Sequence, residues 1–336
     1  MSAYAIPAFY AAAQLFLLTG LGFVVRRSNI WPRSFFIQLS SLVVRIGLPA
    51  YFFAALSRTS LDQVLGAWPV ALAGSAVFLI GIGLSALIFA ALRFAPPDRG
   101  AAIALGGIGN SAFIPLTVAE IVPVTIPLVA ERFGSSQPIL LIGVYLIGFS
   151  PLLWSVGSAI VGGHRGRLKP SQLLSPPVIG ILAGLAVPLF GLQRWLFDPA
   201  LPFYHVHAAL HQAGSITLPL ILIVLGSFIA DLPFNRQRDS HLRVSALAVS
   251  IIRFALLPAL YYAGYFLVLR PLNAPPAVRW VLFLQTHIPP ATSLSVLASF
   301  AGVNEQLTAF TLLVTNVLYL VVLPLYLILF LSLPGM

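Results

Sequence analysis

The chain has 336 residues, of which 59% are hydrophobic and only 8% charged, with a formal net charge of +10. Soluble domains carry roughly 25% charged residues, so this composition indicates a protein that lies in the lipid bilayer. No basic stripe with interleaved aromatic side chains points to nucleic acid, and no Walker or GxGxxG motif points to a nucleotide-driven pump. Cysteine is absent, which excludes disulfides and thiol chemistry, and we expect no cofactor and no metal.

Ten apolar segments qualify as membrane spans, which need about 20 residues each, although the sixth is short. The first has no charged region before it and is followed directly by Arg26-Arg27, so we interpret it as a retained span rather than a signal peptide. In chain order the predicted spans are 6–25, 35–56, 67–92, 100–122, 137–161, 176–192, 207–231, 244–269, 278–300 and 307–331.

The distribution of lysine and arginine predicts the orientation of these spans. The connections after spans 1, 3, 5, 7 and 9 hold eleven such residues, and the opposite side holds five. Because cytoplasmic connections carry the excess of positive charge, we expect the odd connections in the cytoplasm and both termini outside.

Two apolar segments about half a chain apart are interrupted by the same kinds of residues. Asn110–Pro115 aligns with Gln285–Pro290 at an offset of 175, which pairs an amide, a hydroxyl and a proline in both. Because proline cannot continue a helical hydrogen-bond ladder, such breaks survive in lipid only where they are buried or line a cavity. We therefore expect spans 4 and 9 to be broken crossover helices around a substrate site. The residues predicted to bind substrate there are Asn110, Ser111, Pro115, Gln285, Thr286, Pro289 and Pro290.

Ten spans divide into five and five, and an odd number per half places the halves in opposite orientation. A second correspondence supports this division, because Leu48–Ser57 aligns with Leu218–Ser227 at an offset of 170. We expect an all-α integral membrane protein with an inverted repeat. The repeats are residues 1–161 and 176–336, joined by a basic cytoplasmic linker at 162–175.

Several charged residues inside the spans are candidates for function. Arg45 lies near the middle of span 2, where an arginine costs at least about 2.5–3.5 kcal/mol. It either clamps a carboxylate of the substrate or pairs with backbone carbonyls or Glu120. Arg253, nine residues into span 8, is interpreted as structural and able to extend toward the cytoplasm.

Two titratable residues close to the breaks, His287 and Glu120, are candidates for carrying a coupling proton. The alternatives are a hydrogen-bonded histidine in the protein core and a glutamate near the outer water. His205, His207 and His211 have spacings that suit a metal, but we expect a solvated external loop because no acidic partner is nearby.

Several short motifs follow one another in a characteristic order. Arg45–Phe53 carries a proline followed by Phe-rich residues, and Asn110–Leu116, after Asp98-Arg99, is similar to an Asn-x-x-Phe-x-x-x-Pro region shortened by two residues. Further matches are Pro176–Gly184, Leu218–Ser227 and Pro290–Thr292. Together they resemble, over nearly the whole chain, the auxin efflux carrier family of PIN-like permeases. The bile-acid sodium symporters share that family's architecture.

The resemblance implies a five-plus-five inverted repeat in which the substrate lies beside the crossing of spans 4 and 9. It also implies a permease of small organic anions, such as auxin or dicarboxylates, with location expected in a bacterial inner membrane. His287 and Arg45 depart from the family pattern, so the substrate stays open. The coupling ion, H+ or Na+, and a homodimer as opposed to a monomer stay open as well.

Two other functions compete with the carrier. A sensor or receptor would use the same fold without transport, but no connection is long enough for an output domain. An intramembrane enzyme is the weakest hypothesis, because no Ser-His pair, paired Asp or metal motif lies at matching depth.

Overall fold

A computed structural model describes residues 2–94, 96–162, 174–231, 240–302 and 305–333. Within these ranges the regular structure is helical, and extended chain pairs only at one isolated bridge. Helical structure suits a lipid environment, because a helix provides hydrogen-bond partners for its own backbone N–H and C=O groups where water is absent. Most of the predicted linker, residues 163–173, lies outside the described ranges.

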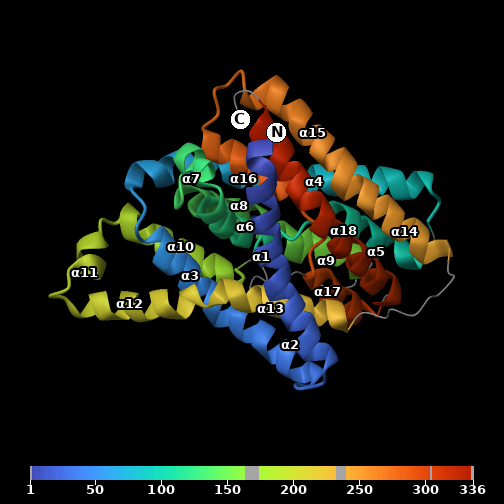
Figure 1. Cartoon of the computed structure of the whole chain (residues 1–336), viewed down its shortest axis with the longest axis horizontal. Coiled ribbons are helices and arrows are strands. Elements are labelled where there is room, and N and C mark those ends of the chain that lie inside the picture. The colour runs from blue at the N-terminus through green and yellow to red at the C-terminus, as the bar shows by residue number, and fades with distance from the viewer. Residues whose placement is uncertain (1, 95, 163–173, 232–239, 303–304, 334–336) are drawn as a thin grey trace.

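The helices follow one another through short connections (Figure 1). In chain order they are α1 (Ser2–Arg27), α2 (Arg33–Leu42), η1 (Val43–Gly47), α3 (Leu48–Leu56), α4 (Leu61–Ala91), α5 (Pro96–Gly107), α6 (Phe113–Thr125), α7 (Pro127–Phe133), α8 (Gln137–Leu152), η2 (Leu153–Gly157), α9 (Ser158–Gly162), α10 (Pro176–Leu189), α11 (Gln193–Phe197), α12 (Pro202–Ser215), α13 (Thr217–Ala230), α14 (Ser240–Ile251), η4 (Ile252–Leu256), α15 (Leu257–Gly264), η5 (Tyr265–Leu269), α16 (Pro276–Thr286), α17 (Ser293–Ala301) and α18 (Glu305–Ser332).

Seven helical segments of the described chain are long and apolar enough to cross a membrane, and the bent pair α6–α7 would make an eighth. This number is lower than the ten predicted spans, because predicted spans 4 and 9 are broken near their middles and α10, in predicted span 6, has only 14 residues. α6 and α7 differ in direction by 115°, at a break next to Pro127, since the residue before a proline avoids helical geometry. The count of ten spans stays a prediction.

π-Helical turns interrupt three of the long spans in the described chain, and two of these turns lie just before a proline. The turn η1 precedes Pro49 and the turn η4 precedes Pro258. Proline lacks the N–H that the preceding turn of an α-helix would use, and a π-turn accommodates the mismatch. Both mid-span arginines, Arg45 and Arg253, lie in these turns.

Close helix packing joins the two halves of the chain. α1 packs along α13, and α3 packs along α10. A Cβ atom on Gly22 would lie 1.9 Å from the carbonyl oxygen of Ile223, and one on Gly226 would lie 1.8 Å from a carbonyl oxygen of α1. Backbones therefore touch directly, which is how helices associate where lipid provides no hydrophobic drive.

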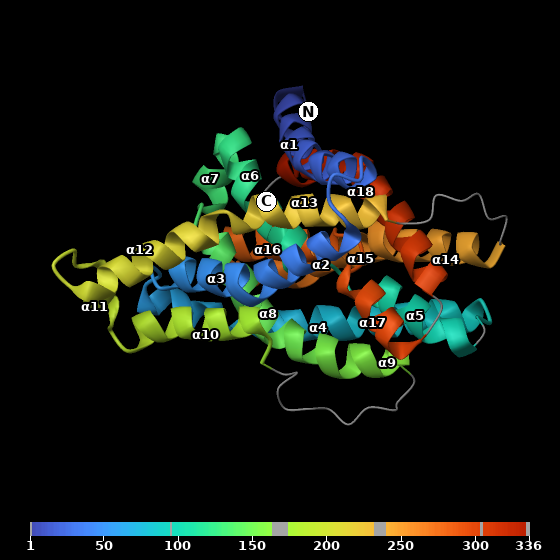
Figure 2. The same cartoon turned by 90° about the horizontal axis from the view of Figure 1, so that it is seen from below.

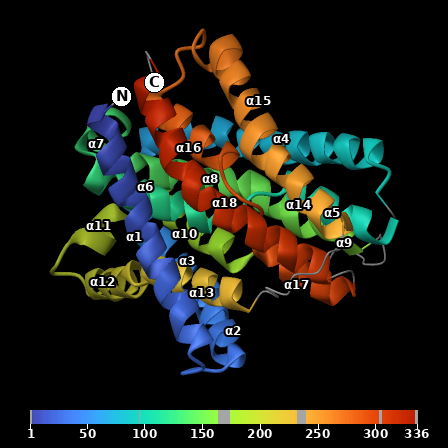
Figure 3. The same cartoon turned by 45° about the vertical axis from the view of Figure 1, so that its right-hand side comes forward.

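The remaining long helices form a second group. α4 packs along α8, and α14 packs along α18. α5, α9, α14 and α17 meet at one end of the molecule, on the right in Figures 1 and 3. At the opposite end α12 extends out to the short helix α11, as Figure 2 shows.

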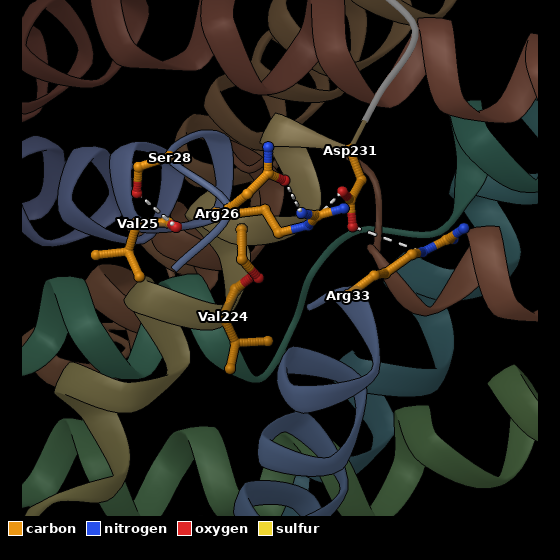
Figure 4. A network of polar contacts seen from close by, with 8 residues as sticks. Val25, Arg26, Ser28, Arg33, Val224 and Asp231 are labelled. Carbon is orange, nitrogen blue, oxygen red and sulfur yellow. Dashed lines mark hydrogen bonds and ion pairs between the residues drawn. The ribbon is translucent and has the colours of Figure 1, made fainter. Parts of the chain in front are cut away.

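A three-residue ion cluster fastens the ends of α1, α2 and α13. Asp231, the C-cap of α13, lies 2.6 Å from Arg26 Nε in the last turn of α1 and 3.5 Å from Arg33 Nε at the start of α2 (Figure 4). Arg26 also donates from Nη1 to Asn29 Oδ1 at 3.2 Å. The cluster fixes the turn between the first two helices against the second half of the chain.

The contact between α1 and α13 can be tested with two glycines on one helix. Gly22→Ala should destabilise the protein by about 1–3 kcal/mol, because its Cβ would overlap the α13 backbone. Gly20→Ala is the matched control, since nothing lies within 4 Å of its Cβ position and alanine favours helix by up to about 1 kcal/mol. The measurement is the thermal midpoint in detergent. Equal midpoints for the two variants would contradict the close packing.

Candidate functional site

The two helix breaks lie against each other inside the protein. Residues 108–112 separate α5 from α6, and residues 287–292 separate α16 from α17. α5 packs against α17, and α6 packs against α16, so the four half-helices form a crossing. The break that the sequence predicts is thus present in both segments.

Gly109 and Pro290 form an isolated antiparallel bridge at the centre of this crossing. In a bridge of this type the facing residues donate no hydrogen bond, so Pro290 fits although it lacks an N–H group. The two flanking backbone hydrogen bonds, each 3.0 Å long, are Asn110 N to Pro289 O and Ala291 N to Ile108 O. Each break therefore provides hydrogen-bond partners for backbone groups of the other break.

The two predicted amide side chains, Asn110 and Gln285, come from opposite breaks and are both buried. Asn110 Oδ1 accepts from Phe113 N at 3.2 Å and caps the start of α6, while its Nδ2 has no partner among the described residues. Gln285 Nε2 donates to Ser111 O at 3.0 Å, and its Oε1 is likewise unpartnered in that part of the chain. Each amide thus supports the broken backbone with one atom, while its other polar atom has no partner within the described residues.

The other predicted residues at the breaks hold the backbone. Ser111 is buried, and its Oγ donates to Gly109 O at 3.4 Å. Thr286 Oγ1 donates to Leu282 O of its own helix at 2.8 Å. Pro115 is buried in the first turn of α6, where a missing N–H costs nothing. Their role in substrate binding stays a prediction.

Arg253, which the sequence analysis interpreted as structural, lies at the crossing, and only its expected extension toward the cytoplasm is wrong. It does not extend toward the cytoplasm, because its side chain is 1% exposed. Its Nε donates to the carbonyl oxygen of Ile288, inside the second break, at 2.8 Å. Gly109 explains the fit, since a Cβ there would lie 2.2 Å from Arg253 Nη2. The glycines just before Asn110 are the sequence signal that a bulky group approaches this backbone.

His287 lies in a cage of aromatic rings. The ring centroids of Phe283 and Tyr326 are 4.2 and 4.6 Å from the centroid of the imidazole. The rings of Tyr261 and Tyr262 meet it edge to face, with centroid distances of 5.5 and 5.6 Å. Nδ1 is 2.8 Å from Phe283 O, which makes Nδ1 the donor of the neutral ring. The buried Nε2 has no hydrogen-bond partner among the described residues, and its role as a proton carrier stays a prediction.

Glu120 and Arg45 lie apart from these contacts. Glu120 accepts a 2.5 Å hydrogen bond from the hydroxyl of Tyr51, which links α6 to α3. Arg45 is exposed on η1, and among the described residues no hydrogen bond or ion pair joins it to either break. The predicted roles of both residues remain untested predictions.

The three clustered histidines are on a helix rather than in the expected external loop. They lie on α12, which begins at Pro202 because proline suits the first turn of a helix. His207 is buried, with Nε2 3.2 Å from Ser57 Oγ. Within the described residues no group of three potential metal ligands occurs.

A small recess with a volume of about 30 Å³ opens beside the start of α6. Its walls come from α1, α13 and α18, and Ile114, next to the break, belongs to them. Most of the lining is aliphatic or aromatic, and Asn316 and Thr19 are its uncharged polar members. This volume is about that of one water molecule, so the surrounding helices would have to part before the recess held a small ligand.

Comparison with known proteins agrees with this architecture. A family model described as "Membrane transport protein" matches residues 7–153 and 166–327. The chain is similar to Protein PIN-LIKES 7 of Arabidopsis thaliana, with 24% identity over 338 residues that cover 80% of this chain and 82% of the relative. It is also similar to Protein PIN-LIKES 1 of the same organism, with 23% identity over 350 residues and 88% and 72% coverage.

A third relative, Protein PIN-LIKES 5 of Arabidopsis thaliana, is 21% identical over 359 residues, with 86% of this chain and 87% of the relative covered. The family model spans both halves of the chain and both helix breaks. The chain belongs to this family of membrane transport proteins, the auxin efflux carrier or PIN-like family that its motifs resemble.

Proposed function

We propose that the protein is a secondary carrier that moves a small organic anion across the membrane by alternating access. The crossing carries this proposal, because two broken helices meet in the interior and a buried donor, Asn110 Nδ2, is left without a partner in the described chain. Broken helices at this depth typically line a transport site. A free amide donor and the N-terminus of α6 suit a carboxylate.

The pairing of helices supports the inverted repeat. If spans 1–5 correspond to spans 6–10, the contact of α1 with α13 has its counterpart in that of α10 with α3. The contact of α4 with α8 likewise corresponds to the contact of α14 with α18. The contact of α5 with α17 corresponds to the contact of α16 with α6. We therefore keep ten spans, with repeats at 1–161 and 176–336, as part of the proposal.

Alternating access then requires a boundary between two groups of helices that move against each other. One body holds α1, α3, α10 and α13, and the other holds the crossing with α4, α8, α14 and α18. The recess lies between them, since α1 and α13 form one wall and α6 and α18 the other. A substrate in the recess would contact both bodies, so rocking of one against the other would expose it alternately on each side.

The lining of the recess predicts the kind of anion. An aromatic or aliphatic carboxylate should be carried better than a short dicarboxylate, because a second charge would be buried against apolar walls. Uptake of labelled indole-3-acetate, malonate, malate and oxalate into proteoliposomes measures this. Faster uptake of the dicarboxylates would contradict the predicted preference, and binding of an anion without flux would favour a sensor over a carrier.

Removal of the crossing amides should lower transport without unfolding the protein. Asn110→Ala and Gln285→Ala should each reduce uptake about 10- to 100-fold, the loss expected for a hydrogen bond to a charged group. Asn110→Asp should lose more, because its carboxylate would repel the anion. Gln38→Ala, an exposed amide on α2, is the control. Wild-type uptake in the Asn110 and Gln285 variants would remove the crossing from the substrate site.

The orientation can be tested with single cysteines, since the chain has none of its own. Ser28, after α1, and Ala200, between α11 and α12, are both exposed. With both termini outside, an impermeant maleimide added to intact cells should label Ala200→Cys and leave Ser28→Cys unlabelled until the membrane is opened. The reverse pattern would invert the topology.

A further inference from the structure

The turn between α1 and α2 concentrates positive charge at one end of the molecule, far along the chain from either break. Arg26, Arg27 and Arg33 follow one another closely there. Among the described residues, ion pairs join two of them to a single carboxylate, Asp231, which lies 2.6 Å from Arg26 Nε and 3.5 Å from Arg33 Nε. The arginines outnumber this carboxylate, so the cluster keeps a net positive charge.

Local contacts fix the shape of this turn and present its arginines to the outside. Asn29 has a left-handed backbone with a φ of 55°, which asparagine adopts more readily than most residues. Its side-chain oxygen accepts from Arg26 Nη1 at 3.2 Å, which holds the turn against the end of α1. Arg33 meets Asp231 through Nε, while the tip of its largely exposed guanidinium is directed away from the aspartate (Figure 4).

Large apolar side chains are exposed at the same turn. Ile30 is 64% exposed and Trp31 46%, and the indole is held by stacking on Phe35 at a centroid distance of 4.8 Å. The flanking helices also expose apolar side chains, Val24 in the last turn of α1 and Ile37 in α2. Tryptophan beside arginine is typical of the membrane–water interface, where the indole lies at the level of the lipid headgroups.

Charge and apolar surface occur together at this turn and do not do so at the turn after α4. Arg93 is exposed there, but the neighbouring aromatic residue, Phe94, is buried. A soluble anion would contact the arginines of the α1–α2 turn and leave Ile30 and Trp31 in water, at a cost to the hydrophobic effect. A ligand with an anionic head and apolar chains satisfies both.

We propose that the α1–α2 turn binds an anionic phospholipid, with Arg27 and Arg33 at the phosphate and Ile30 and Trp31 against the acyl chains. A guanidinium binds phosphate through two parallel hydrogen bonds. Under the predicted orientation the lipid belongs to the cytoplasmic leaflet, whose anionic headgroups attract basic side chains near the membrane. The site is separate from the crossing and does not depend on the carrier function proposed above.

Trp31 is the probe for this site, because bromine atoms on lipid acyl chains quench the fluorescence of an indole that they touch. The protein is reconstituted with either brominated phosphatidylglycerol or brominated phosphatidylcholine. The signal of Trp31 is the difference between wild type and Trp31→Phe. Brominated phosphatidylglycerol should quench this signal at a lower mole fraction than brominated phosphatidylcholine. Equal quenching by the two lipids, or no quenching by either, would overturn the proposal.

Substitution of the arginines separates charge from shape. Arg27→Gln and Arg33→Gln should each lower the preference for phosphatidylglycerol about fivefold, the contribution expected of one arginine near an anionic surface. Arg27→Lys and Arg33→Lys keep the charge and should retain most of the preference. Arg93→Gln is the matched control and should behave as wild type. Gln variants with the wild-type preference, or Lys variants that lose as much as the Gln variants, would rule out a charge-selective lipid site.

A second measurement distinguishes the lipid from a soluble anion. The thermal midpoint of the protein in detergent is followed as phosphatidylglycerol, phosphatidylcholine or inorganic phosphate is added at constant ionic strength. Phosphatidylglycerol should raise the midpoint to a plateau, because a ligand that binds the folded state stabilises it, and the other two should not. An equal rise with inorganic phosphate would assign the turn to a soluble anion, and no rise with phosphatidylglycerol would leave it without a lipid ligand; either result overturns the proposal.

Discussion

The structure depends on one constraint, that a backbone polar group at membrane depth needs a partner within the protein. Two helices break in the interior, and each break would leave donors and acceptors exposed to lipid. They are satisfied because the breaks face each other and pair across the Gly109–Pro290 bridge. The amides of Asn110 and Gln285 complete the pairing, so the polar groups that stabilise the crossing are also those that offer free atoms to a ligand.

Glycines allow several helices to approach each other closely, in addition to the buried apolar side chains of the core. Gly22 and Gly226 bring the backbones of α1 and α13 into contact, and Gly81 brings α4 against the end of α5. Large apolar side chains gain little by contacting each other instead of lipid, so close backbone approach supplies the attraction. The Asp231 ion cluster then fastens the helix ends, with the Arg26–Asp231 pair partly buried and Arg33 largely exposed to solvent.

Charge and shape at the crossing both bear on the ligand that we propose for it. A fixed guanidinium at the crossing favours negative charge nearby, while the recess beside α6 offers mostly apolar walls. These features suit a ligand with one anionic group and an apolar body. Under the proposed alternating access, the recess between the two groups of helices would open as those groups move against each other, while close packing within each group is kept.

The sequence by itself determined the helical membrane class, the family and the two breaks. Composition, the length of the apolar segments and the matched prolines are local properties of the sequence. In a lipid bilayer they specify spanning helices and the positions where these helices break. The sequence placed Arg45 ahead of Arg253 as a candidate for function, although both are arginines near the middle of a span. Only the tertiary structure placed Arg253 against Ile288 and left Arg45 exposed. The direction of a side chain follows from which helix packs on which face and where a glycine leaves room, and those contacts join residues more than a hundred positions apart.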